Sequence, residues 1–195
     1  MAAAADLVER AKNGDKDALD ALLERHLPMV YRFVSMRLGR DHADLDDVVQ
    51  ETLIAAARSV GSLRAERDGA VPAWFLTVAR HKVADHFRRS PEVRELVDTE
   101  AVSLDRDVHE IVAGRDRDRR LREAMRSLTS EQEEVLVLRF VLGFDGEQTA
   151  AITGSTVGAV KALQHRGLAS LEKLLLSQGE EWRRATSCRP SSRSS

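Results

Sequence analysis

The chain has 195 residues, which suits one or two small domains, and its abundant charge and moderate apolar content are typical of a soluble globular protein. Its formal net charge of −2 combines 30 basic with 32 acidic side chains, and because these gather in different segments, the total does not exclude a nucleic-acid partner. Cys188 is the single cysteine, which excludes an intramolecular disulfide and a cysteine-cluster zinc site and fits a reducing compartment. The first residues lack a basic start and a long apolar run, so we expect no signal peptide, no membrane span and a cytoplasmic location.

The first segment, up to about residue 90, is predicted to be helical throughout, with glycines marking the ends of its helices. Asp15 is placed to cap a long helix. Within that helix, the residues that recur at core spacing are Leu19, Leu22, Leu23, His26, Val30, Phe33, Val34 and Leu38.

Residues 44–57 predict a helix with an apolar inner face and an acidic outer face. The inward positions are Leu45, Val48, Val49, Thr52 and Ala56. The outward positions are Asp47, Gln50, Glu51 and Ile54. An acidic face that carries an exposed isoleucine can meet a basic partner, and the alternative is an acidic surface that only faces water.

The next predicted helix, residues 71–90, combines an aromatic pair with many basic side chains, and Pro72 suits its first turn. The basic side chains are Arg80, His81, Lys82, His86, Arg88 and Arg89. Basic residues near aromatic rings can hold a phosphate backbone and stack unpaired bases. The alternative to base stacking is that Trp74 and Phe75 lie in the core, and this is what we expect of Trp74. His81, Asp85 and His86 also offer metal-ligand atoms, but no further ligands recur at helical spacing.

The composition then becomes acidic, and no helical apolar stripe persists across residues 91–118, which predicts a flexible linker. Helical signals resume at Leu121 and include a capping-box spacing at residues 130–133, so we expect a second compact domain at 119–176. Residues 177–195 have the composition of a disordered tail. The predicted fold is all-α: two small helical domains, the first at 1–90, joined by an acidic linker.

The second domain ends in a predicted helix, tight turn and helix. Asp145 is placed to cap the helix at 147–153, and Gly154 can close it in the left-handed conformation. One side of the following helix collects Val157, Val160, Gln164, Leu168, Leu171 and Leu175. The other side collects Gly158, Lys161, Ala162, His165 and Arg166. A helix-turn-helix offers such a basic half-helix to the major groove, and the alternative is a helical hairpin with a solvated basic face.

Four motifs in this order resemble the extracytoplasmic-function (ECF) sigma factors, the smallest class of the sigma-70 family, which contain only the region 2 and region 4 domains. Residues 44–51, AspLeuAspAspValValGlnGlu, resemble region 2.2. Residues 73–89 resemble regions 2.3 and 2.4, and residues 128–144 resemble region 4.1. The recognition-helix sequence at 158–167, GlyAlaValLysAlaLeuGlnHisArgGly, is closer to the actinobacterial sigma D-type branch than to the commoner pattern of the family.

The resemblance implies a division of labour between the two domains. Region 2 is expected to dock on the β′ clamp helices of core RNA polymerase through Asp47, Gln50, Glu51 and Ile54, and to capture an unpaired base of the minus-ten element. The resemblance assigns that base to a loop at Arg80, His81 and Lys82, followed by Ala84, Asp85 and Arg88 at the start of the next helix. The alternative is that these residues form an uninterrupted basic helix that only touches phosphate. Region 4 is expected to hold the β flap and to read the minus-thirty-five element through Ser155, Gly158, Lys161, Ala162, His165 and Arg166.

The same resemblance implies an anti-sigma protein, often membrane-anchored, as a further partner, and a linker that threads the polymerase channel. It implies no catalysis, no cofactor, no metal and no small-molecule substrate. Two alternatives belong to other classes of protein. One is a helix-turn-helix regulator that never binds core polymerase, and the other is a helical metal-dependent hydrolase built on His81, Asp85 and His86.

Overall fold

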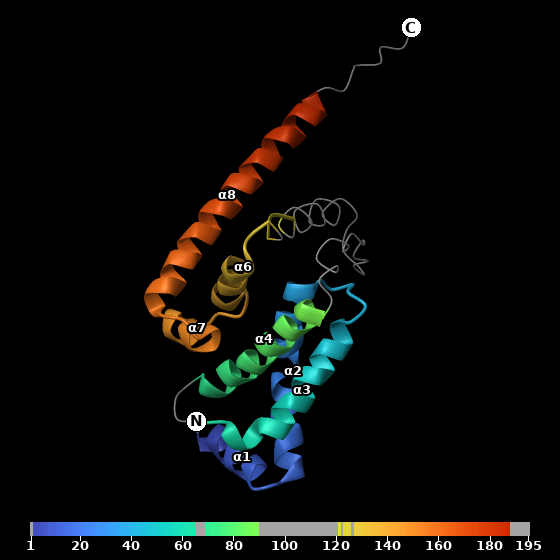
Figure 1. Cartoon of the computed structure of the whole chain (residues 1–195), viewed down its shortest axis with the longest axis vertical. Coiled ribbons are helices and arrows are strands. Elements are labelled where there is room, and N and C mark those ends of the chain that lie inside the picture. The colour runs from blue at the N-terminus through green and yellow to red at the C-terminus, as the bar shows by residue number, and fades with distance from the viewer. Residues whose placement is uncertain (1, 65–68, 90–120, 122, 126, 188–195) are drawn as a thin grey trace. The chain divides into compact units, whose positions relative to one another are not determined.

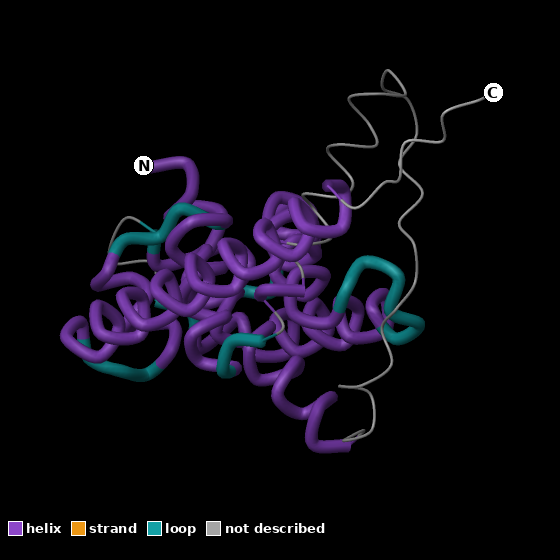
Figure 2. Tube along the Cα trace, turned by 90° about the horizontal axis from the view of Figure 1, so that it is seen from above, coloured by secondary structure: helices purple, strands orange, loops and turns teal. Residues whose placement is uncertain are grey.

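The computed structural model describes residues 2–64, 69–89, 121, 123–125 and 127–187. Those residues are helices joined by short turns and loops (Figure 2), and the absence of strands among them agrees with the all-α prediction. The predicted linker at 91–118 lies outside the described residues. Because that linker is not described, the domain boundaries expected from the sequence stay predictions. None of the described helices is long and apolar enough to cross a membrane.

The described residues form two compact units, and the larger one contains the four N-terminal α-helices. These are α1 (Ala2–Lys12), α2 (Lys16–Leu38), α3 (Leu45–Ser59) and α4 (Ala70–Arg89), with a 3₁₀ turn, η1 (Val60–Ser62), after α3. Helices α2, α3 and α4 pack against one another, and α1 packs against α2 (Figure 1). This unit also includes the π-helix η3 (Val137–Val141), helix α7 (Gly146–Thr153) and the first turn of α8.

Local sequence signals set the ends of these helices as predicted. The Asp15 side chain accepts a hydrogen bond from the Ala18 amide at 3.1 Å, which caps α2. Gly39 has a φ of 106° and closes α2 by donating its amide hydrogen to the carbonyl of Ser35. Pro72 lies in the first turn of α4, where its missing amide hydrogen costs no intrahelical bond.

The core of the larger unit is built mainly from large apolar side chains of α2 and α4, with smaller ones from α3. Phe33 and Phe75 are fully or almost fully buried, as are Leu76 and Val34. All five inward positions predicted for α3 are buried. A second cluster, formed by Val8, Ala11, Ala18, Leu22 and Leu63, attaches α1 to α2, and Trp74 packs against it. Trp74 is half-buried and packs against the core, in line with the core alternative kept for it.

The smaller unit contains residues 121–136, as far as they are described, and α8 from Lys161 onward. It includes α6 (Ser130–Leu136), while α8 as a whole runs from Val157 to Ser187. Thr129 and Gln132 cap α6: the Gln132 amide donates to Thr129 Oγ1 at 3.3 Å, and the Thr129 amide donates to Gln132 Oε1 at 3.2 Å. The capping box thus begins one residue before the predicted position, because threonine at 129 serves the same purpose as serine at 130.

The C-terminal end of α8 differs from the prediction. The helix continues to Ser187, through the first part of the stretch at 177–195 that we expected to be disordered. Residues 178–187 contain no proline, and glutamate, glutamine, arginine and alanine dominate them, so their intrinsic helix propensity is high enough to prolong an existing helix. Residues 188–195 lie outside the described part of the chain.

Burial of His26 generates a prediction about acid stability. The His26 ring stacks on Phe75 with 4.5 Å between centroids, and its Nδ1 donates to the Leu22 carbonyl at 2.8 Å. Desolvation lowers the pKa of His26 below its ordinary value. As the pH falls, His26 therefore binds a proton in the unfolded chain before it does so in the folded chain. Lowering the pH from about 7.5 to 5.5 should therefore reduce the free energy of unfolding, and His26→Phe, which keeps the ring stack, should weaken that dependence. Urea unfolding at several pH values measures the slope, and parallel curves for the two proteins would contradict the prediction.

Candidate nucleic-acid and polymerase interfaces

The helix pair α7 and α8 has the local geometry predicted for a helix-turn-helix. Asp145 and Gln148 form a reciprocal capping box at the start of α7, with the Gln148 amide 2.8 Å from Asp145 Oδ1. Gly154 closes α7 with a φ of 67°, in the left-handed region that favours glycine. Thr156 then caps α8 by accepting a hydrogen bond from the Ala159 amide at 3.1 Å. Two caps and one glycine therefore set a turn of three residues between the helices.

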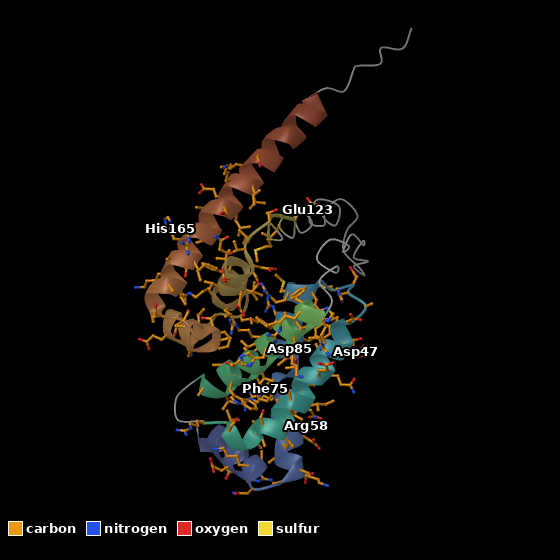
Figure 3. All side chains as sticks on the ribbon, in the orientation of Figure 1. Asp47, Arg58, Phe75, Asp85, Glu123 and His165 are labelled. Atoms are coloured by element: carbon orange, nitrogen blue, oxygen red, sulfur yellow. The ribbon has the colours of Figure 1, made fainter. Side chains whose placement is uncertain are left out.

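The six residues predicted to contact the upstream duplex are all exposed. They are Ser155, Gly158, Lys161, Ala162, His165 and Arg166. His165 projects from α8 on the side away from α6 (Figure 3). Lys161, His165 and Arg166 bring donors to the first three turns of α8, which is the part of a recognition helix that reaches base edges and phosphates.

The inner face of α8 is rotated from the predicted one. Val160 is buried as predicted, and Gln164 and Leu171 are half-buried, but Leu168 is 42% exposed and Leu175 is 38% exposed. The buried position one residue earlier is Gly167, where an added Cβ would lie 3.1 Å from Leu136 Cδ1 of α6. The absence of a side chain lets α6 approach α8 here, and this contact turns the two leucines outward.

The acidic face predicted on α3 is present. Asp47, Gln50 and Ile54 are exposed on the side opposite the buried stripe, and Ile54 keeps 43% of its surface accessible. Figure 3 shows Asp47 on α3. The exposed isoleucine gives this surface an apolar contact point beside the Asp47 carboxylate.

Glu51, the fourth residue predicted for this face, is engaged inside the unit. One of its carboxylate oxygens, Oε2, accepts a hydrogen bond from Arg89 at 3.2 Å and lies 3.7 Å from Lys82 Nζ. Both partners belong to the basic end of α4. Glu51 thus joins α3 to α4, and its negative charge is partly balanced before any other molecule approaches.

The predicted loop at Arg80, His81 and Lys82 does not form, because α4 is one continuous helix from Ala70 to Arg89. No glycine or proline lies between Pro72 and the end of α4, so nothing in the sequence interrupts it. Described residues outside an α-helix come before α4: they include the 3₁₀ turn η1 after α3, and Gly69, which has a φ of 80°. The prediction of a loop at 80–82 is therefore wrong.

A continuous helix distributes the predicted minus-ten residues over two sides. His81, Ala84 and Arg88 are exposed, and Asp85 is half-buried and accepts a hydrogen bond from Arg88. Arg80 is half-buried, and Lys82 is turned toward Glu51. Phe75 is buried against His26 and contacts Trp74 edge to face at 5.1 Å, so the Phe75 ring is not placed to stack on a base, while Trp74 is half-buried.

His86 lies inward, apart from the other two members of the metal trio considered in the hydrolase alternative. His86 Nδ1 lies 3.9 Å from Asp44 Oδ2, and its ring meets the His42 ring edge to face at 5.2 Å. Desolvation, followed by the nearby His42, lowers the pKa of His86, whereas Asp44 acts to raise it. His81 is exposed and Asp85 is bound to Arg88, so these three side chains do not converge on one ion.

Comparison with known proteins accounts for this combination of surfaces. Residues 22–91 match the family described as Sigma-70 region 2, and residues 118–171 match Sigma-70, region 4. ECF RNA polymerase sigma factor SigD of Mycobacterium tuberculosis is 35% identical over 180 residues, which cover 89% of this chain and 84% of SigD. The chain belongs to the ECF sigma factors.

Two further relatives agree with this assignment. The sigma factor BldN of Streptomyces coelicolor is 35% identical over 174 residues, which cover 87% of this sigma factor and 65% of BldN. The solved structure of CnrH in complex with the cytosolic domain of CnrY superposes with a TM-score of 0.65 at 26% identity, covering 88% of this chain and 96% of CnrH. The family assignment does not favour the alternative of a helix-turn-helix regulator outside the sigma factors.

Three features of this sigma factor are not predicted by its sequence pattern. Gly167 belongs to the recognition-helix pattern, but no short-range signal indicates that its missing Cβ sets the contact between α6 and α8. Arg139 donates to the Phe144 carbonyl at 2.6 Å and holds the turn before α7, which no short motif indicates. His42 and Asp44 precede α3 and meet His86 from α4. The signal available for this last feature was a histidine and an aspartate two residues apart, which is too common to interpret.

The close contact at Gly167 predicts that a side chain there will force α6 and α8 apart. We expect Gly167→Leu to lower the free energy of unfolding by about 1–3 kcal/mol, because it overpacks the contact with Leu136. Gly158→Leu, on the same helix, is the matched control, since an added Cβ there meets only Thr156 Oγ1 at 3.9 Å. Thermal unfolding followed by circular dichroism compares the two variants, and equal melting temperatures would show that the α6–α8 contact does not depend on glycine.

Proposed function

We propose that this ECF sigma factor binds core RNA polymerase through the acidic face of α3 and directs promoter-specific initiation through the basic faces of α8 and α4. The observation that carries the proposal is the exposure of the six predicted recognition residues on α8, behind a turn that two caps and Gly154 hold in shape. Family membership supplies the context in which such a helix works together with a polymerase-binding face. The chain itself performs no catalysis and acts in the cytoplasm, beside polymerase and DNA.

Helix α3 is the proposed contact with the β′ clamp helices. Asp47, Gln50 and Ile54 offer charge, hydrogen bonding and an apolar contact on one exposed side of a helix whose other side is locked in the core. Glu51 contributes mainly by holding the basic end of α4 at 3.2 Å from its carboxylate, so we assign it a positioning role next to the interface. A surface built this way is rigid before binding, which reduces the entropy lost on association.

Helix α8 is the proposed reader of the minus-thirty-five element. Lys161, His165 and Arg166 carry the donors, while Ser155, Gly158 and Ala162 are small enough to let the backbone approach the duplex. We also propose that the region 4 domain, which contains α8, binds the β flap of polymerase.

We propose that helix α4 contacts the minus-ten element. The contact is made by side chains on one face of the continuous helix, since there is no loop at 80–82. His81, Ala84 and Arg88 share the exposed side, and the Asp85 carboxylate orients Arg88. An arginine held in this way is suited to a phosphate or a base edge of the non-template strand.

We further propose that a helical anti-sigma protein holds this chain inactive by covering its polymerase-binding surfaces. The support is the likeness to CnrH, whose solved structure contains the cytosolic domain of CnrY. The antagonist would contact the same exposed isoleucine and carboxylates of α3 as polymerase. The two partners would therefore compete for this surface.

Reconstituted transcription tests the proposed function. Core polymerase with the wild-type chain should initiate at specific promoters. Asp47→Arg should reduce both core binding and transcription, because it would place a positive charge against basic side chains of the partner, and like charges facing each other at an interface cost several kcal/mol. We choose Asp47 because reversing Glu51 would also break its ion pairs with Arg89 and Lys82.

Asp20→Arg on α2 is the matched control for Asp47→Arg. Asp20 is exposed and lies on a different helix, so this variant should bind core as the wild type does. Wild-type affinity of Asp47→Arg in a pull-down, with a normal circular dichroism spectrum, would exclude α3 as the docking helix. Promoter-specific binding of the wild-type chain without core, and no transcription with it, would support the regulator alternative.

A second prediction concerns duplex reading by α8. Arg166→Ala should weaken promoter binding of the reconstituted holoenzyme by about 1–3 kcal/mol and relax selectivity at one position, if Arg166 contacts a base. Lys173→Ala is the matched control, because Lys173 is exposed on the same helix two turns beyond the recognition residues. Binding to a series of single-base promoter variants separates the outcomes: a uniform loss with a smaller salt dependence would assign Arg166 to phosphate, and no loss would remove it from the interface.

A further inference from the structure

Three side chains that meet at the junction of α3 and α4 carry atoms that can bind a metal ion. His42 and Asp44 lie in the connection before α3, and His86 lies near the end of α4. One ligand atom from each of them lies within 4.8 Å of the other two. All three belong to the larger unit, and none of them has been assigned a role in polymerase or promoter binding.

His86 is the first reason to look for a ligand here. Its side chain is 7% exposed, and its Nε2 is buried without a hydrogen-bond partner among the described residues. Its Nδ1 points at Asp44 Oδ2 from 3.9 Å, which is beyond hydrogen-bonding distance. Neither ring nitrogen of His86 therefore makes a hydrogen bond among the described residues, and a buried imidazole of this kind calls for an explanation such as an ion bound at Nδ1, the nitrogen that faces Asp44.

Asp44 is the second reason. It occupies the N-cap position of α3, where an aspartate usually accepts a hydrogen bond from an amide of the first turn, yet its side chain makes no cap bond. The carboxylate is turned toward His86 instead. Two positions earlier, His42 Nδ1 accepts a hydrogen bond from the Asp44 amide at 3.1 Å, which ties the two prospective ligands into one short loop.

We propose that His42, Asp44 and His86 bind a divalent transition-metal ion, with Zn²⁺ as the best-matched species. Two imidazoles and one carboxylate form a ligand set that zinc accepts, with bonds of about 2.0–2.2 Å. Tetrahedral ligand atoms then lie about 3.4 Å apart. His42 and Asp44 are half-buried in a connecting loop, so rotation of their side chains can close the present separations, which reach up to 4.8 Å.

Coordination would exchange weak contacts for strong ones at this junction. His86 Nδ1 and Asp44 Oδ2 face the ion directly, and His42 gives up the 3.1 Å hydrogen bond from the Asp44 amide if Nδ1 is its ligand atom. The fourth position belongs to water, which leaves an open site and a bond between the start of α3 and the end of α4. The expected consequence is a more stable larger unit, since an ion that binds only the folded state stabilises it by mass action.

Metal binding by the full-length chain tests the proposal without polymerase or DNA. The protein is stripped with a chelator, and Zn²⁺ is added in a calorimetric titration and in a thermal-unfolding series. Co²⁺ is the spectroscopic probe, because its visible absorption reports coordination by nitrogen and oxygen. The wild-type chain should bind one equivalent of metal and show a higher melting temperature with it.

Asp44→Asn and His42→Gln are the decisive variants, because they alter loop residues and spare the buried His86. Each should weaken Zn²⁺ binding at least tenfold and abolish the shift in melting temperature. Asp41→Asn, in the same connection, and His81→Gln, on the exposed side of α4, are the matched controls and should bind as the wild type does. Equal Zn²⁺ affinity in Asp44→Asn, His42→Gln and wild type would overturn the proposal, as would binding that only Cys188→Ser removes or no binding by the wild type.

Discussion

Helix α4 is packed against α2 and α3 along one side, and the larger unit depends on that packing. Phe75, Leu76, Ala79 and Val83 are buried on this side, and each large apolar side chain removed from water contributes about 1.5–3 kcal/mol. Because a helix repeats every 3.6 residues, burying these positions leaves His81, Ala84 and Arg88 on the opposite side. The exposed side of α4 that carries His81 and Arg88 is therefore a consequence of the core.

The junction of α3 and α4 changes from apolar to polar toward the C-terminal end of α4. Val48, Val49 and Thr52 of α3 are buried in the core, whereas Glu51 meets Lys82 and Arg89 at the edge. Exposed ion pairs of this kind contribute little to stability, about 0–1 kcal/mol each, so their main effect is to orient side chains. They draw two cations of α4 toward α3 and leave Asp47 and Ile54 as the accessible part of the acidic face.

In the smaller unit, the rotation of α8 follows from one missing side chain. Gly167 lets Leu136 of α6 come close, and the helix turns so that Val160, Gly167 and the half-buried Leu171 face inward. That rotation leaves Lys161, His165 and Arg166 exposed together. The contact that packs α6 on α8 is thus also the contact that orients the proposed recognition surface.

The sequence by itself determined the elements and most of their faces, because caps, glycines and apolar spacing act over one or two turns. The caps at Asp15 and Asp145, the left-handed Gly154 and the buried stripe of α3 all follow from such short-range signals. Only the tertiary structure decided which way α8 is rotated and that Glu51 is paired with cations of α4. It also brought His86 to His42 and Asp44. These features depend on contacts between helices distant in sequence, and no periodic pattern within one helix specifies which side chain of another helix it will meet.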